Sequence, residues 1–239
     1  PLGDIHINRG VWNASTGVFD WSVVSTLSPN HSTSFDGNER LTGLNIGFSP
    51  DGMTGWIGAL GDLVGGVDSV YNVMFSQSTD GGLTWGDLFE YNMRDNSDLT
   101  DSLHRFFVID SALMDTFVFG GNYPATAFDA DLVVDKNGAP HMITYVANGQ
   151  AYSTNASAYV DPGYSVFSGG ESYVLDFTFD SFGDLNILYL SFTNFLRGTF
   201  GNQTVDPAGE FTADTYTQAS RSEDGSIIMF SWTDSDPAL

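Results

Sequence analysis

A short phrase recurs along this chain: an apolar run, a turn that places Asp or Asn beside Gly, and a second apolar run. Such phrases predict antiparallel hairpins, because β-branched and aromatic residues favour strands and Gly supplies the positive φ of tight turns. The phrase occurs in LNIGFSPDGMTGWIGAL, DLVVDKNGAPHMITYV, LDFTFDSFGDLNILYL and ASRSEDGSIIMFSWT, around Gly52, Gly138, Gly183 and Gly225.

The turns are regularly spaced, with 86 residues from Gly52 to Gly138 and 87 from Gly138 to Gly225. YNVMF and LFEYN predict a second hairpin in the first interval, which makes a four-stranded antiparallel sheet per unit. A sheet that is apolar on both faces must stack on its neighbours. We therefore expect an all-β fold, a partial β-propeller of four-stranded antiparallel blades, with about three to five blades. Two arrangements stay open, since the Gly183 hairpin either completes a long blade or opens a separate one.

Residues 1–239 are expected to form a single propeller region that is a fragment of a longer protein. The segment DIHINRGVW resembles the end of a unit, and SWTDSDPAL follows a hairpin that elsewhere precedes two more strands. End blades would expose sheet edges, which native chains cover. The rest of a larger chain or a secretion or surface complex is therefore the expected partner.

The charge is strongly negative, with 30 acidic against 7 basic residues and a net charge of −23. Such a field repels phosphate backbones and anionic lipid surfaces, so nucleic acid is excluded as a partner. Membrane insertion is also not expected, because the most apolar stretch, GWIGALGDLVGGV, is too short to span a bilayer. There is no cysteine, so neither a disulfide nor a cysteine-based zinc site can form.

One stretch, SQSTDGGLTW, gathers Ser78, Asp80, Gly82, Thr84 and Trp85 within eight positions. Asp80 can accept backbone N–H groups across a turn, Gly82 supplies positive φ, and the two hydroxyls tie the flanks of the turn. Trp85 is expected to be buried beneath it. The pattern predicts a structural turn and not a catalytic site.

This stretch resembles the Asp box, S-x-D-x-G-x-T-W, of sialidases and other secreted propellers (the BNR repeat), and all five defining positions match. The resemblance implies that the turn joins the third and fourth strands of a blade, at the rim and away from the axis where ligands bind. More loosely, the SEDGSIIMFSWTDSDP type of repeat is similar to large surface proteins exported by the type IX secretion route. Both resemblances imply a bacterial protein that is secreted or held at the cell surface.

A complete sialidase site is not visible. Such chemistry needs three arginines that converge on the substrate carboxylate and a tyrosine activated by glutamate. None of the arginines lies in the R-I-P context that usually accompanies Asp-box sialidases; they are Arg9, Arg40, Arg94, Arg105, Arg197 and Arg221. We therefore assign no catalytic residue. His141, at the start of a strand, is expected to be a hydrogen-bonded packing residue.

No cofactor is required by these patterns, but Ca²⁺ is the cation that an acidic loop could hold. DNSDLTD offers Asp95, Asp98 and Asp101 at alternating spacings, without the Gly and terminal Glu of an EF-hand. A solvated loop is the competing interpretation.

The function expected from the sequence is a non-catalytic secreted or cell-surface propeller, a binding or structural module of a larger exported protein with a carbohydrate or protein ligand. Two alternatives stay open. One is a sialidase-like glycoside hydrolase whose catalytic residues lie partly outside this chain, and the other is a calcium-dependent carbohydrate-binding or adhesion domain.

Overall fold

The computed structural model describes residues 4–29, 41–61, 72–93, 96, 99, 119–152, 165–166, 172–179, 183–193 and 216–233. The elements in them are β-strands, as the composition predicts, apart from helical backbone at Met93 and Leu99. No helix in this part of the chain is long and apolar enough to cross a membrane. The strands are β1 (Ile5–Asn13), β2 (Val18–Leu27), β3 (Leu41–Phe48), β4 (Gly55–Gly61), β5 (Asn72–Ser78), β6 (Phe89–Tyr91), β7 (Phe119–Val134), β8 (Pro140–Tyr152), β9 (Ser165–Val166), β10 (Ser172–Phe179), β11 (Leu185–Thr193), β12 (Gln218–Arg221) and β13 (Ile228–Ser231).

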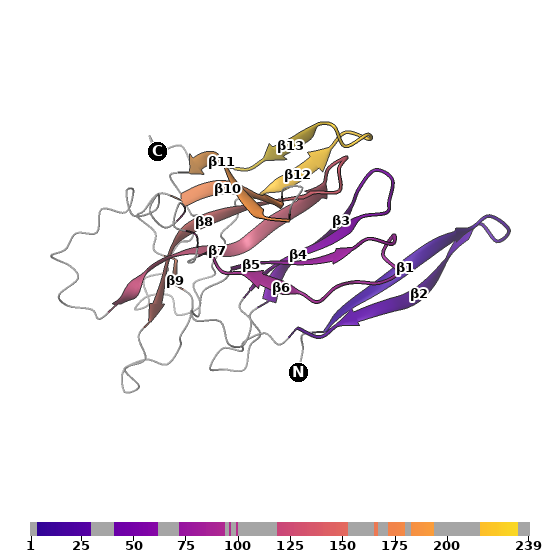
Figure 1. Cartoon of the computed structure of the whole chain (residues 1–239), viewed down its shortest axis with the longest axis horizontal. Coiled ribbons are helices and arrows are strands. Elements are labelled where there is room, and N and C mark those ends of the chain that lie inside the picture. Colours follow the sequence, from indigo (N-terminus) through magenta and orange to yellow (C-terminus); the bar gives the residue numbers. More distant parts are fainter. Residues whose placement is uncertain are drawn as a thin grey trace, which may run out of the picture.

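The strands form four antiparallel sheets that follow one another along the chain (Figure 1). Two are complete four-stranded paths, β3-β4-β5-β6 and β7-β8-β10-β11, the second with β9 paired to β8. The two-stranded sheet β1-β2 precedes the first of them in the chain, and the two-stranded sheet β12-β13 follows the second. Over the described residues the sheets make an open stack, and they do not close into a ring.

The first strands of successive sheets lie side by side. The amide of Asn45 in β3 donates to the carbonyl of Ala130 in β7 at 2.9 Å, and Asp131 in β7 accepts the N–H of Ala219 in β12 at 2.8 Å. A Cβ placed on Gly47 would come within 3.2 Å of Val134 Cγ2, so β3 and β7 are in close contact at this point. The sheets therefore follow one another in space in the order of their first strands, β3, β7 and β12.

The alternative that the sequence left open is now decided. The hairpin around Gly183 joins β10 to β11, the third and fourth strands of the sheet that the Gly138 hairpin begins. One unit of 86 residues is thus one four-stranded sheet with long connections, and Gly183 does not open a separate sheet.

The turns around Gly52, Gly138 and Gly225 are structurally equivalent. Each glycine has a positive φ, 72°, 83° and 68°, and each donates its N–H to the carbonyl three residues earlier at 2.8–3.1 Å. Consecutive turns also touch, because Lys136 N–H donates to Gly225 O at 3.1 Å and Trp56 Nε1 donates to Gly138 O at 2.8 Å. The equal spacing in sequence therefore becomes a row of contacts in space.

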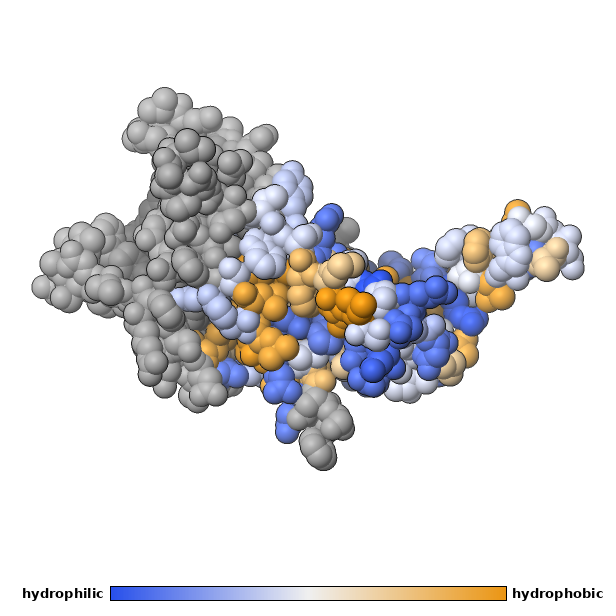
Figure 2. Space-filling view, turned by 90° about the horizontal axis from the view of Figure 1, so that it is seen from above, coloured by the Kyte–Doolittle hydropathy of each residue, from blue (hydrophilic) through white to orange (hydrophobic). Residues whose placement is uncertain are grey.

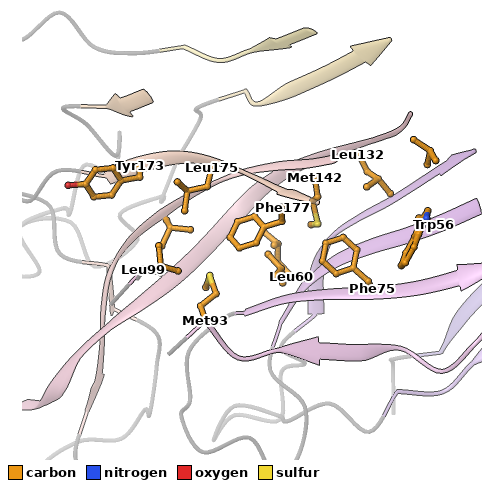
Figure 3. Close-up of a cluster of buried hydrophobic side chains, with 13 residues drawn as sticks. Trp56, Leu60, Phe75, Met93, Leu99, Leu132, Met142, Tyr173, Leu175 and Phe177 are labelled. Atoms are coloured by element: carbon orange, nitrogen blue, oxygen red, sulfur yellow. The ribbon is translucent and has the colours of Figure 1, made fainter. Parts of the chain in front are cut away.

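The main core lies between the two complete sheets (Figure 3). Trp56 stacks on Phe179 with ring centroids 5.2 Å apart, and Phe75 meets Phe179 edge-on at 5.1 Å. Phe75 and Phe177 are fully buried, each with 0% exposure, and such a side chain stabilises the fold by about 1.5–3 kcal/mol. A smaller core on the other face of β4 joins Ile57 to Ile5, Ile7 and Leu27 of the β1-β2 hairpin.

A candidate binding cleft beside the Asp-box turn

The Asp-box turn joins β5 to β6 and is organised around Asp80. Its Oδ1 accepts the N–H of Leu83 at 3.0 Å and of Thr84 at 2.9 Å, and its Oδ2 accepts the Thr84 hydroxyl at 2.6 Å. Ser78, which is buried, accepts the N–H of Gly82 at 2.9 Å and lies 2.9 Å from Asp80 Oδ1. The Thr84 hydroxyl, followed by the Thr84 N–H, lowers the pKa of Asp80 to about 2. These donors favour the charged carboxylate.

Trp85 is half-buried, which corrects the expectation that it would be fully enclosed beneath the turn. Its Nε1 donates to Gly82 O at 3.3 Å, and its ring meets Phe48 edge-on at 5.9 Å. It lies at the margin of the smaller core. Among the described residues, the sheet on this side has two strands, β1 and β2, so less apolar surface covers the indole than in the four-stranded sheets.

A cleft of about 310 Å³ opens where β1 passes the Asp-box turn and the β3-β4 turn. The indole of Trp85 and the ring of Phe48 are its aromatic wall, and Asn8 and Arg9 of β1 are its polar side. It is lined by Ile7, Asn8, Arg9, Gly10, Ile46, Phe48, Gly52, Gly81, Gly82 and Trp85. The sequence pointed to the Asp box as a structural turn alone, but the same turn borders this opening.

Glycine at position 82 leaves room beside the aromatic wall of the cleft. A Cβ on Gly82 would lie 3.0 Å from Phe48 Cζ. The lining residues that the structure describes include no carboxylate, histidine, serine or cysteine, the side chains that most often act as general acids, bases or nucleophiles. Aromatic rings beside an amide and a guanidinium can instead bind a neutral polar ligand without reacting with it.

A second polar group lies on the β7-β8-β10-β11 sheet. His141 Nδ1 lies 2.7 Å from Asp176 Oδ2, and Asp176 is only 2% exposed. Asp176 Oδ1 and the hydroxyl of Tyr145 are buried with no hydrogen-bond partner. Burial, and then the charge of Asp129, raises the pKa of Tyr145 above its usual range. His141 is thus hydrogen-bonded within the fold, and its carboxylate partner was not found from sequence, although an Asp inside the apolar run LDFTF was the available signal.

Arg221 serves the fold. Its guanidinium donates to the carbonyls of Ser222, Glu223 and Phe48, each at 3.1 Å, and so ties the β12-β13 turn to the end of β3. Arg9 lies in the cleft and is exposed. The remaining arginines lie outside the described residues, namely Arg40, Arg94, Arg105 and Arg197. Three converging arginines are therefore not brought together by the part of the chain that is described.

The candidate calcium ligands Asp95, Asp98 and Asp101 also fall outside the described residues. Among the residues that are described, no group of three or more His, Cys, Asp or Glu side chains could hold a metal ion. The segment FDADLVVD has three acids, and each accepts backbone N–H groups. Asp129 accepts the N–H of Tyr216 at 3.2 Å, and Asp131 accepts that of Ala219 in β12. Asp135 organises the Gly138 turn by accepting the N–H of Asn137 and Ala139 at 2.8 Å.

Comparison with known proteins adds no assignment. The sequence matches no known protein family and no curated protein at a significant level of similarity.

Proposed function

We propose that this chain is a non-catalytic binding module with the architecture of an Asp-box β-propeller, part of a larger protein that a bacterium secretes or displays at its surface. The observation that carries the proposal is the stack of sequential antiparallel sheets whose first strands β3, β7 and β12 lie side by side. Blades around a propeller axis have this relation. The Asp-box turn, which joins the third and fourth strands of its sheet, supports the same architecture.

The cleft beside Trp85 supports a carbohydrate as the ligand class. The apolar face of a sugar ring fits against aromatic side chains such as those of Phe48 and Trp85. The amide of Asn8 and the guanidinium of Arg9 supply donors for ring hydroxyls. The described residues of the lining include no pair of carboxylates, which favours binding over hydrolysis.

The test of this function compares binding with turnover. Sialosides and neutral oligosaccharides are titrated into the chain while tryptophan fluorescence is recorded, and each is then assayed for hydrolysis. We expect saturable binding without turnover, weakened at least about 10-fold by Arg9→Ala, while Lys136→Ala, at an exposed basic side chain that does not line the cleft, serves as the control. Hydrolysis at ordinary enzyme rates that a single substitution abolishes would establish the glycosidase alternative and refute the proposal.

The architecture has a separate test, because the chain contains no cysteine. In the variant Gly47→Cys/Val134→Cys, the new side chains of β3 and β7 are within disulfide reach, since a Cβ at Gly47 lies 3.2 Å from Val134 Cγ2. We expect rapid intramolecular oxidation under native conditions. Failure to oxidise, with the single-cysteine variants folded, would contradict the side-by-side placement of the first strands.

A further inference from the structure

The two faces of the β1-β2 hairpin differ at its base. Cross-strand partners share a face of a two-stranded ribbon, and successive residues of a strand alternate between the faces. The inner face is apolar at the base and packs on β4 through the buried residues Ile5, Ile7 and Leu27. The outer face is polar at the base, where His6 and Thr26 are partners and hydrogen-bond to each other at 3.2 Å.

Farther along the hairpin the same outer face becomes aromatic. Trp12 pairs with Phe19, and Trp21 pairs with Gly10. Successive ring centroids of Trp12, Phe19 and Trp21 are 5.2 and 5.9 Å apart, and these side chains, the aromatic ladder, are 56%, 51% and 70% exposed. A face that packs on a second sheet is apolar where the two sheets overlap. The polar base therefore separates the ladder from sheet packing.

The tip of the hairpin also extends past the sheet that covers its inner face. Val11 and Val18 alternate with ladder residues and so lie on the inner face, yet they are 49% and 54% exposed. β1 and β2 have nine and ten residues, against seven and three in β5 and β6. The hairpin projects from the other described residues (Figure 2). A neighbouring sheet packed on the base thus leaves the tip uncovered.

The rings of the ladder are held in place by the hairpin itself. A Cβ on Gly10 would come within 3.0–3.1 Å of three atoms of the Trp21 indole, so this indole lies across the bare backbone of Gly10. The ring of Phe19 is tilted by 69° from that of Trp12 and by 41° from that of Trp21. Contacts of this kind fix the ring orientations in advance, which lowers the entropy cost of binding.

The size and charge of this surface select the kind of partner. Rings of roughly 200 Å² each with this exposure offer about 350 Å², whereas a stable protein partner needs about 800 Å² on each side. The ladder and its neighbours on the outer face, Asn8 and Val23, carry no charge, although the net charge of the chain is −23. A narrow, uncharged ligand with apolar faces fits this row of rings.

We propose that the aromatic ladder is a second carbohydrate subsite, which stacks on the sugar rings of a neutral polysaccharide. The inference rests on the proposed function, since it extends carbohydrate binding beyond the cleft. Asn8 and Gly10 line the cleft and also belong to the outer face, so the two subsites adjoin. Because the rings are tilted by 69° and 41°, the ligand is a single twisted chain and not the flat face of a crystalline polysaccharide.

The first experiment measures binding to soluble xylan, mannan and mixed-linkage glucan by calorimetry, and to crystalline cellulose by depletion. We expect saturable binding to at least one soluble chain, and tighter binding to it than to crystalline cellulose. Trp21→Ala and Trp21→Leu should each weaken this binding at least about 10-fold with an unchanged circular dichroism spectrum, whereas Trp21→Tyr should retain most of it. Tyr189→Ala, at a 59% exposed ring of β11, is the matched control and should bind as the wild type does.

Two of these results would overturn the inference. Wild-type affinity of Trp21→Leu would show that no ring is needed, and tighter binding to crystalline cellulose would contradict the twisted-chain ligand. The same holds for a wild-type chain that binds short oligosaccharides in the cleft but none of the three soluble polysaccharides.

The second experiment separates the ladder from the cleft. Arg9→Ala should weaken binding of the polysaccharide less than Arg9→Ala/Trp21→Ala does, because linked subsites both contribute to affinity. Loss of binding in Arg9→Ala together with wild-type affinity in Trp21→Ala would overturn the ladder and leave the cleft as the site. Absence of binding to any carbohydrate, short or long, would refute the proposed function as well.

Discussion

The contact between successive hairpin turns can be measured with one glycine. Gly225, in the β12-β13 turn, has a φ of 68°, and a Cβ there would come within 2.7 Å of both Lys136 N and Pro50 Cγ. Its carbonyl accepts the N–H of Lys136 at 3.1 Å. Gly225→Ala therefore strains the backbone and also forces apart three turns that the sheet stack brings together.

The expected magnitude has two parts. An L residue in the left-handed region costs roughly 1–2 kcal/mol, and overpacking against atoms that cannot move aside costs roughly 1–3 kcal/mol more. Gly52 separates the two parts, because it occupies the same S-x-D-G turn with a φ of 72° and a Cβ there would meet nothing within 4 Å. Gly52→Ala should cost about 1–2 kcal/mol and Gly225→Ala about 2–5 kcal/mol.

The assay is urea unfolding at neutral pH, followed by tryptophan fluorescence and by circular dichroism, with the free energy of unfolding compared among wild type, Gly52→Ala and Gly225→Ala. The difference between the two variants isolates the contact between the turns. Equal free energies for the two variants would refute the reasoning, because φ strain alone would then explain both.

Three further predictions use the same unfolding measurement. Trp85→Ala should cost about 2 kcal/mol, less than the 3–5 kcal/mol of a fully buried aromatic residue, because the indole is half-exposed; a cost near 5 kcal/mol would show that the indole is enclosed. His141→Ala should lower the free energy of unfolding by about 1–3 kcal/mol, because it leaves both carboxylate oxygens of Asp176 unpaired. The control His6→Ala, at an exposed hydrogen bond, should be nearly neutral. Equal effects of the two variants would rule out a special role for the pair of His141 and Asp176. Because the pKa of Asp80 in the folded chain is about 2, below the ordinary 3.8, its contribution to the free energy of unfolding is complete above about pH 4 and is lost as pH falls toward 2. Asp80→Asn should therefore flatten the fall of the free energy of unfolding between pH 4 and pH 2. An unchanged fall would contradict this role of Asp80.

Much of the local structure was readable from sequence. Hairpins around Gly52, Gly138, Gly183 and Gly225 were predicted from turn chemistry, which is local, and all four are present. The spacing between turns predicted a repeated unit, and the long unit of 86 residues is the one observed.

The candidate site was harder to predict from the sequence. The Asp box was visible as a turn, but its place on the margin of a cleft depends on where β1 crosses it, and β1 is separated from it by about 70 residues of sequence. The anchoring role of Arg221 likewise depends on a carbonyl 173 residues away in the chain. No local pattern encodes such partners, because they are chosen by the packing of one sheet on the next.

The sequence by itself determined an all-β chain, its hairpin turns and their order, since strand periodicity and glycine φ act within a few residues. Only the tertiary structure decided that β10 and β11 complete the second sheet, that Trp85 is half-exposed, and that β3, β7 and β12 lie side by side. These features follow from burying the two faces of each sheet against distant segments, and that burial is a property of the assembled stack and not of any one stretch of residues.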